Sequence, residues 1–287
     1  MLYVQLTIVL LAFAANSLLC RWALDVHQFD PMLFSLIRLS SGAFILSILL
    51  YRFVPANSEV NLVPWREGHF WKLGAALAIY AVGFSWAYLQ LDTGVGAFIL
   101  FATIQIVIQF AAFVLGERLS LVQWAGVIIS LAGLSWLLLP NSAAPDLFSA
   151  GLMWVAASGW SWFVMLGKQS QQPLQDVQQA FVAASVITLL LSPLLLQNWS
   201  HWHWIPWVLA LVSGVVASGL GYFLWYRILP RLGLSKAAQF QLLVPVIALL
   251  MGMIFLGETL SQHALGAMVL ITTGVALSTV FHRTSLR

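Results

Sequence analysis

Apolar runs of about 20 residues follow one another along almost the whole chain. A helix needs roughly 20 apolar residues to cross about 30 Å of bilayer hydrocarbon, because each residue adds only about 1.5 Å. Runs of this length lie at about 4–24, 31–51, 70–90, 94–115, 121–139, 148–168, 177–197, 206–226, 234–256 and 262–281. Of the 287 residues, 61% are hydrophobic and 7% are charged, whereas soluble domains carry about 25% charged residues. The sequence therefore predicts an all-α membrane protein with ten transmembrane helices.

Two of these runs begin with recognisable helix-start signals. Asp30 precedes Pro31, and an aspartate at the N-cap followed by proline at the first helical position favours a helix start. Ser120 precedes Gln123 by three residues, which is the spacing of a capping box. We therefore expect the second helix to begin at Pro31 and the fifth to begin just after Ser120.

The basic residues are distributed unevenly between the two sides, which predicts the orientation because cytoplasmic loops are enriched in Lys and Arg. With a cytoplasmic N-terminus, ten of them lie at cytoplasmic ends, namely Arg52, Arg66, Lys72, Arg118, Lys168, Arg227, Arg231, Lys236, Arg283 and Arg287. The outside ends then hold only Arg21, and Arg38 lies within a helix. We predict a multi-pass protein of the bacterial cytoplasmic (inner) membrane with both termini in the cytoplasm.

A six-residue motif occurs twice and predicts an internal repeat. Leu115 to Ser120 reads LGERLS and Leu256 to Ser261 reads LGETLS, a match at five of six positions. Gly133 and Gly274 keep the same offset of 141 residues. The chain therefore divides into a first five-helix repeat over 1–140 and a second over 141–287. Because five is odd, the second repeat must be inverted, an arrangement typical of secondary transporters with a central cavity.

The same features resemble a known family. The two LGE-x-LS turns, the Asp30-Pro31 start, Arg38 within its helix and Pro245 within the ninth run are similar to the EamA-type branch of the drug/metabolite transporter superfamily. The resemblance implies ten helices in two inverted five-helix repeats around a central cavity. It also implies export or exchange of amino acids and similar small metabolites. The family often has a proline in both the fourth and ninth helices. Here Ile104 stands opposite Pro245, so we expect the two halves to bend unequally.

Arg38 is the only basic residue well inside a predicted helix. A buried charge in the membrane is energetically unfavourable and usually faces a cavity or a partner. Arg38 could attract a substrate carboxylate. It could equally be structural, bonding backbone carbonyls or extending outward to Asp25 or Asp30. Both interpretations stay open at this point.

A group of amide side chains marks the fourth and ninth helices. Gln105 and Gln109 are four residues apart and so share one helix face, with Thr103 close by. Gln241 lies one turn before Pro245, and proline there removes a backbone hydrogen bond and frees a carbonyl. These groups could line a cavity for a zwitterionic solute, or they could join helices to one another. We predict that they line the cavity.

Aromatic residues are abundant, and most suit the interfacial belts of a membrane protein. Tyr80, Phe84, Trp160 and Tyr222 lie deeper and form either a cavity wall or ordinary packing. The predicted substrate-binding set is Arg38, Tyr80, Phe84, Thr103, Gln105, Gln109, Trp160, Tyr222 and Gln241.

The turn carboxylates Glu117 and Glu258 raise the question of proton coupling. Each follows a glycine that suits a helix C-cap and precedes a serine that suits the next N-cap. A carboxylate near a helix N-terminus is also favourable electrostatically. We interpret both as structural, so facilitated export and proton antiport stay equally compatible with the sequence.

These observations favour a secondary membrane transporter that exports amino acids or similar small neutral or zwitterionic metabolites by alternating access. The alternatives are an intramembrane enzyme, which would need clustered His, Asp or Cys at one depth, and a non-transporting sensor or structural protein. We expect no enzymatic activity. The single cysteine, Cys20, and the scattered histidines predict no metal and no cofactor. The sequence contains no Walker A motif, so we do not expect direct use of ATP. The expected partners are a small-molecule substrate and the lipid bilayer, without nucleic acid. A homodimer is left open.

Overall fold

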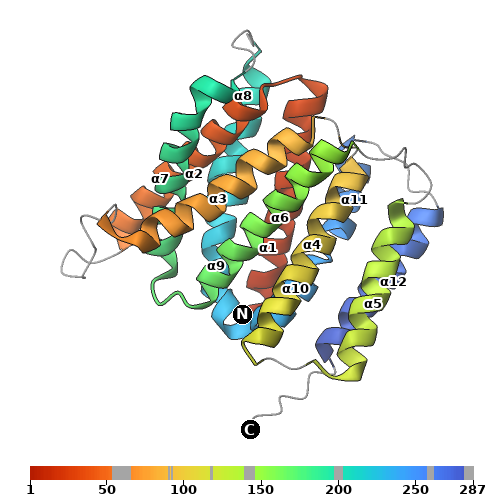
Figure 1. The fold of residues 1–287 in the computed structure, drawn as a ribbon. Helices are drawn as coiled ribbons and strands as arrows, with labels where there is room; N and C mark the ends of the chain where they lie inside the picture. Colours follow the sequence, from red (N-terminus) through yellow and green to blue (C-terminus); the bar gives the residue numbers. More distant parts are fainter. Residues whose placement is uncertain are drawn as a thin grey trace.

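The computed structural model describes residues 1–53, 66–89, 91, 93–116, 119–138, 146–196, 203–256 and 262–280, and these fold into helices without strands (Figure 1). The elements are α1 (Leu2–Arg21), η1 (Trp22–Val26), α2 (Pro31–Phe53), α3 (Gly68–Ala87), α4 (Thr93–Val114), α5 (Leu121–Leu138), α6 (Leu147–Lys168), α7 (Pro173–Leu195), α8 (Trp204–Val212), η4 (Ser213–Leu220), α9 (Gly221–Leu232), α10 (Leu234–Gln241), α11 (Val244–Leu256) and α12 (Gln262–Val280). The prediction of an all-helical fold is confirmed.

The helices correspond to the ten apolar runs. Within the described ranges, six helical segments are long and apolar enough to cross a membrane, and four shorter apolar helices of 10–17 residues complete the set. The eighth run is one continuous rod made of α8, η4 and α9, and the ninth consists of α10 and α11. The turn residues Glu117 and Glu258 and most of the connection between α2 and α3 lie outside the described residues.

Both predicted helix starts are confirmed. The Oδ1 atom of Asp30 accepts hydrogen bonds from the backbone N–H groups of Met32 at 2.8 Å and Leu33 at 3.0 Å. Ser120 and Gln123 form a reciprocal capping box: the Ser120 N–H donates to the Gln123 Oε1 at 2.7 Å, and the Gln123 N–H donates to the Ser120 Oγ at 3.3 Å. These bonds satisfy amide groups that a helix start leaves without an intrahelical partner.

A third cap begins α6. Asp146 accepts a hydrogen bond from the backbone N–H of Ser149 at 2.8 Å, and this bond lowers the pKa of the Asp146 carboxyl. A lowered pKa means that the ionised form is favoured in the folded protein. The cap is therefore present at neutral pH and is lost as the pH falls through that pKa.

Pro245 divides the predicted ninth helix. Proline has no N–H to donate and its ring collides with the carbonyl four residues earlier, which here belongs to Gln241. The chain instead makes a tighter turn, in which Leu242 N donates to Gln239 O at 3.1 Å and Leu243 N to Phe240 O at 3.0 Å. In α4, which has no proline, Thr93–Val114 is one unbroken helix. This difference agrees with the expected unequal bending.

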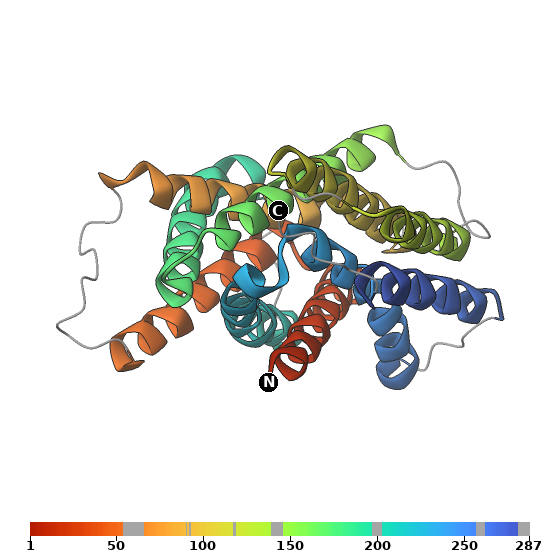
Figure 2. The ribbon, with the colours of Figure 1, turned by 90° about the horizontal axis from the view of Figure 1, so that it is seen from below.

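α5 and α12 form an antiparallel pair at one side of the molecule (Figures 1 and 2). Glycines allow their backbones to meet: a Cβ atom added to Gly126 would lie only 2.6 Å from the Gly274 carbonyl oxygen. The Ser130 hydroxyl donates to the Ile271 carbonyl at 3.3 Å, and these residues are themselves 141 positions apart. The last helices of the two halves thus pack directly against each other.

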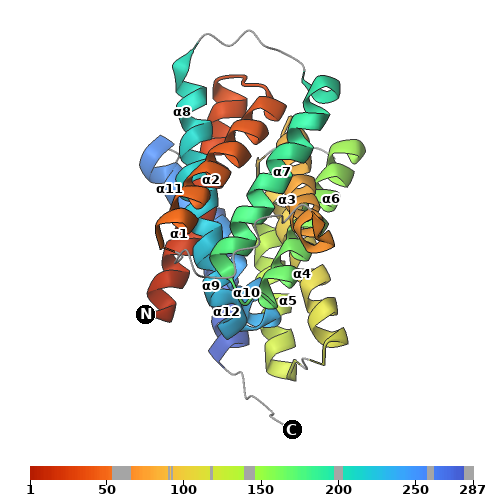
Figure 3. The ribbon, with the colours of Figure 1, turned by 90° about the vertical axis from the view of Figure 1, so that its left-hand side faces the viewer.

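The other helices pack around α1, α3 and α6. α3 lies between α6 and α7, α2 packs on α7 and η4, and α1 contacts α9, α11 and η4. α1 begins and α12 ends at the same end of the molecule (Figure 3). The region between α1, α3, α4, α6 and α9 holds the deepest aromatic side chains, and the candidate site lies there.

Candidate functional site

A pocket lies among helices of both halves of the chain. The empty space within its wall, including the part that is open to solvent, is about 350 Å³. The wall consists of Phe13, Asn16, Ser17, Tyr80, Phe84, Leu100, Phe101, Ile104, Trp160, Tyr222, Gln241 and Val244. α1, α3 and α4 supply most of it, and α6, α9, α10 and α11 supply the rest. A pocket of this kind, mostly apolar with a few polar groups, is typical of small-molecule sites.

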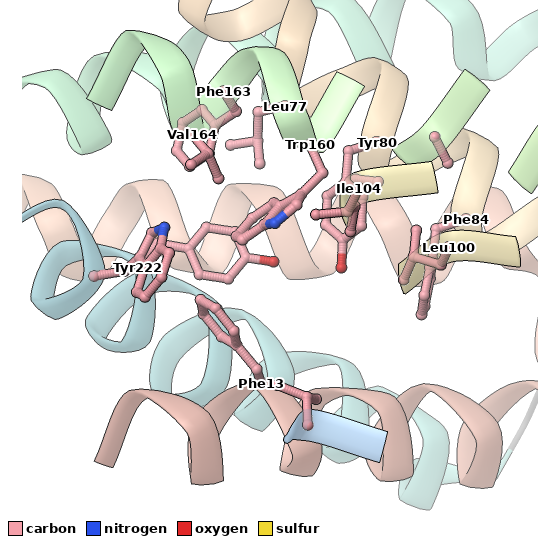
Figure 4. Close-up of a cluster of buried hydrophobic side chains, with 14 of the residues drawn as sticks. Phe13, Leu77, Tyr80, Phe84, Leu100, Ile104, Trp160, Phe163, Val164 and Tyr222 are labelled. Atoms are coloured by element: carbon pink, nitrogen blue, oxygen red, sulfur yellow. The ribbon is translucent and has the colours of Figure 1, made fainter. Parts of the chain in front are cut away.

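Six of the lining residues are aromatic, and four of their rings form one cluster (Figure 4). Trp160 is at their centre: its ring centroid lies 5.3 Å from that of Phe13, 5.0 Å from that of Tyr80 and 4.9 Å from that of Tyr222. The ring planes of Phe13 and Trp160 are 86° apart, the edge-to-face geometry that aromatic pairs prefer. The wall is therefore both a packed cluster and a surface that a solute can contact.

The polar groups of the wall are neutral. The indole N–H of Trp160 donates to the Gln241 Oε1 at 2.6 Å. Asn16 accepts a hydrogen bond from the Ser213 hydroxyl. No acidic or basic side chain is among the lining residues that the structure describes. The described wall residues therefore present only neutral polar groups and apolar surface to the pocket.

Arg38 lies directly behind this wall. Its side chain is 1% exposed. The Nε donates to the Ser218 hydroxyl at 2.8 Å and the Nη2 to the Tyr222 hydroxyl at 2.5 Å. The guanidinium carbon lies 5.4 Å from the centroid of the Tyr80 ring. The Nη1 has no hydrogen-bond partner among the described residues.

A purely structural Arg38 was expected to bond backbone carbonyls or to extend to Asp25 or Asp30. Neither a backbone carbonyl nor Asp30 receives its hydrogen bonds; two hydroxyl groups do, and the Asp25 side chain lies outside the described residues. Ser218 belongs to the π-helix η4 and Tyr222 to the first turn of α9. π-helical segments are frequent at functional sites, and here η4 contains Ser218 and directly precedes the turn that holds Tyr222.

A second polar group lies between α4 and α10. Gln105 and Gln109 are buried, with exposed fractions of 1% and 6%. The Gln109 Oε1 accepts a hydrogen bond from the Ser235 hydroxyl at 3.0 Å. Both amide atoms of Gln105, the Nε2 of Gln109 and the Oε1 of Gln239 have no partner within the described part of the chain. We call these four residues the α4–α10 seam.

The structure brings five of the nine predicted residues to the pocket wall and places four elsewhere. Those on the wall are Tyr80, Phe84, Trp160, Tyr222 and Gln241. Arg38 is one hydrogen bond behind it, Gln105 and Gln109 lie in the seam, and Thr103 is buried on α4. Substrate binding by all nine stays a prediction.

Sequence reasoning missed the contribution of α1. Phe13, Asn16 and Ser17 line the pocket and were not in the predicted set. Asn16 carried a usable signal, since a polar side chain inside an apolar helix usually faces a partner or a cavity. Phe13 carried none, because an aromatic residue in a transmembrane run packs against lipid or protein equally well.

The seam gives a prediction in which two similar substitutions act in opposite directions. Gln105→Leu removes a buried amide that has no partner among the described residues, so we expect unchanged or higher thermal stability in detergent. Gln109→Leu breaks the bond to Ser235, and we expect a loss of about 0.6–1.5 kcal/mol, the range for hydrogen bonds between membrane helices. A marked loss in Gln105→Leu would mean that its amide is bonded in the folded protein.

The sequence of this chain is similar to those of known transporters. The model of the EamA-like transporter family matches residues 2–139 and again 147–280. An uncharacterized protein of Pseudomonas aeruginosa is 40% identical over 269 residues, which cover 93% of this chain and 91% of that protein. A Salmonella typhimurium protein named "probable amino-acid metabolite efflux pump" is 29% identical, covering 66% of this chain and 68% of its own. The threonine/homoserine exporter RhtA of Escherichia coli is 28% identical over 55% of each chain.

The fold also has a solved counterpart. A crystal structure superimposes with a TM-score of 0.78 and covers 97% of this chain and 99% of its own, at 19% sequence identity. At that identity the likeness concerns the fold alone. It agrees with the arrangement of helices described above.

Proposed function

Because this chain belongs to the EamA-like transporter family and is a multi-pass membrane protein, we propose that it exports amino acids or similar small neutral or zwitterionic metabolites across the bacterial cytoplasmic membrane. The observation that carries the proposal is the aromatic pocket, which lies among helices of both halves and has no charged side chain among its described wall residues. Relatives named as an amino-acid metabolite efflux pump and a threonine/homoserine exporter support this class of solute.

The proposed mechanism is alternating access between two inverted five-helix repeats, at 1–140 and 141–287. Two separate matches to the family model support the repeat. The register of α5 and α12 supports the inversion: Gly126 meets Gly274, and Gly133 meets Ala267. With the repeat offset of 141 residues, Gly126 corresponds to Ala267 and Gly274 corresponds to Gly133, so one contact is the repeat-related copy of the other. Such a symmetric antiparallel contact is expected from a two-fold axis perpendicular to both helices.

The α4–α10 seam supports a route for the solute between the pocket and the end of the molecule where α10 begins. Polar amide atoms buried without partners are energetically unfavourable, and the seam holds several of them. Water would satisfy these atoms if α4 and α10 separated. The arrangement in which α4 and α10 are in contact is therefore locally destabilised. This would allow the two helices to alternate between a packed and a separated arrangement.

Reconstitution tests the function directly. Purified protein in liposomes loaded with one unlabelled amino acid should accumulate the same labelled amino acid by counterflow, and the accumulation should saturate. Each of the twenty common amino acids is assayed in turn, with protein-free liposomes as the control. If no amino acid enters faster than into protein-free liposomes, the proposed solute class is wrong.

The orientation gives a further prediction. We propose that both termini are cytoplasmic, because ten basic residues then lie at cytoplasmic ends and only Arg21 outside. A reporter fused after Arg287 should therefore report the cytoplasm, and one fused after Asp146 the outside. The same compartment for both would contradict the proposed inversion.

A further inference from the structure

We infer that the transported solute carries a carboxylate, and that the hydroxyl group of Tyr222, held by Arg38, is the group that recognises it. This inference rests on the proposed function and names the chemistry of its solute. It comes from three features: a buried cation without a counter-ion among the described residues, a tyrosine that joins this cation to the pocket, and a helix distortion that positions both.

The charge of Arg38 has no anionic partner in the described part of the chain. Its hydrogen bonds go to two neutral hydroxyl groups, and its Nη1 donates to none. A lone cation buried at membrane depth is unfavourable unless an opposite charge approaches it. A bound carboxylate would supply that charge, so the empty site is suited to an anionic group.

Tyr222 connects Arg38 to the pocket. Its oxygen accepts the hydrogen bond from the Arg38 Nη2, and its side chain also lines the pocket. Because the oxygen is the acceptor in that bond, Arg38 does not use the O–H of Tyr222. In the empty pocket the hydroxyl also interacts with the hydroxyl groups of Tyr80 and Ser218, and a bound carboxylate would accept the Tyr222 O–H in their place. Donation by Arg38 polarises the hydroxyl and strengthens its own donation, as happens in chains of hydrogen bonds at low dielectric.

Arg38 itself is not on the pocket wall. The tyrosine lies between the guanidinium and the solute, so Arg38 is a positioning residue that acts through Tyr222. The arrangement attracts an anion without exposing the guanidinium to the pocket. A directly exposed cation would hold the solute too tightly for release. Tyr80, whose ring lies beside the guanidinium, brings a second hydroxyl to the same end of the pocket (Figure 4).

The position of Tyr222 depends on η4. Ser213 and Ser218 of this π-helix bond Asn16 and Arg38, so both serines are fixed by long-range partners. A Cβ added to Gly214 would lie 2.3 Å from the Arg38 carbonyl oxygen, and this close approach brings α2 and η4 together. The other described lining residues are aromatic, aliphatic or neutral polar and include no carboxylate, and the aromatic rings among them suit the apolar or ammonium part of an amino acid.

The test compares each L-amino acid with its primary amide, which has nearly the same shape but no carboxylate. Binding to purified protein is measured by thermal shift, and the same compounds compete in counterflow. The wild type should bind an acid at least tenfold more tightly than its amide. Tyr222→Phe should weaken acid binding by about ten- to hundredfold, the effect of losing a hydrogen bond to a charged group, and leave amide binding nearly unchanged.

Tyr226→Phe is the matched control. Tyr226 lies one turn further along α9, is fully buried, and donates its hydroxyl to the Phe163 carbonyl at 2.7 Å. It does not line the pocket, so its loss should lower stability and leave the acid-to-amide ratio unchanged. Arg38→Lys keeps the positive charge and should retain part of the preference for acids over amides. Arg38→Gln removes the charge and should abolish this preference.

The outcomes separate the inference from the proposed function. Equal binding of acids and amides by the wild type, or an unchanged ratio in Tyr222→Phe, overturns the inference and leaves the transporter proposal standing. If the wild type binds and transports neither acids nor amides, the proposed function is wrong and the inference falls with it.

Discussion

Gly274→Leu should leave little folded protein in the membrane. A Cβ atom at this position would lie 2.3 Å from the Ser130 Oγ, 2.5 Å from the Gly126 carbonyl oxygen and 2.6 Å from the Ser130 nitrogen. Two of these atoms belong to the α5 backbone and cannot rotate away. Helix association in membranes depends on such close packing of small residues, so we expect α5 and α12 to separate.

The expected loss is about 3 kcal/mol or more, the upper end for inserting atoms into a packed core. Tm in detergent should then fall by roughly 6–12 °C, together with the yield of monodisperse protein. Gly151→Leu is the control, since nothing lies within 4 Å of a Cβ added on this exposed face of α6. A Tm for Gly274→Leu close to that of Gly151→Leu would mean that the α5–α12 contact is not tight.

The helices and their starts could be predicted because they depend on local sequence. A run of 20 apolar residues satisfies its own backbone inside lipid, so each span was recognisable without knowledge of its neighbours. Asp30 and the Ser120–Gln123 pair bond amides within three residues, which makes them equally readable. The bend at Pro245 was expected for the same reason, since it follows from one residue.

The site could be predicted only in part because its contacts are long-range. Arg38 was recognisable as unusual, yet its partners Ser218 and Tyr222 are 180 and 184 residues away. Nothing in the local sequence distinguishes η4 from an ordinary helix. In a membrane protein, moreover, apolar residues face lipid, core and cavity alike, so Phe13 and Ile104 had the same composition signal as residues that only pack.

The aromatic cluster gives the second large effect, through Trp160→Ala. Its ring contacts Phe13, Tyr80 and Tyr222, and its N–H is the partner of Gln241. Deleting a buried tryptophan side chain typically destabilises by about 3–5 kcal/mol. It would also remove the central part of the pocket wall. We expect Tm to fall by roughly 6–20 °C and solute affinity per folded molecule to fall more than tenfold.

Two further variants separate packing from recognition. Trp154→Ala removes a tryptophan of the same helix that is 58% exposed, so it should change Tm far less. Trp160→Phe keeps a ring in the cluster and leaves the Gln241 Oε1 without its donor, a loss of about 1–3 kcal/mol. If Trp160→Ala lowers stability but leaves the affinity of the remaining folded protein unchanged, Trp160 only packs. If affinity falls in Trp160→Ala and is largely kept in Trp160→Phe, the solute contacts the face of the ring, and the hydrogen bond to Gln241 serves to hold that face toward the pocket.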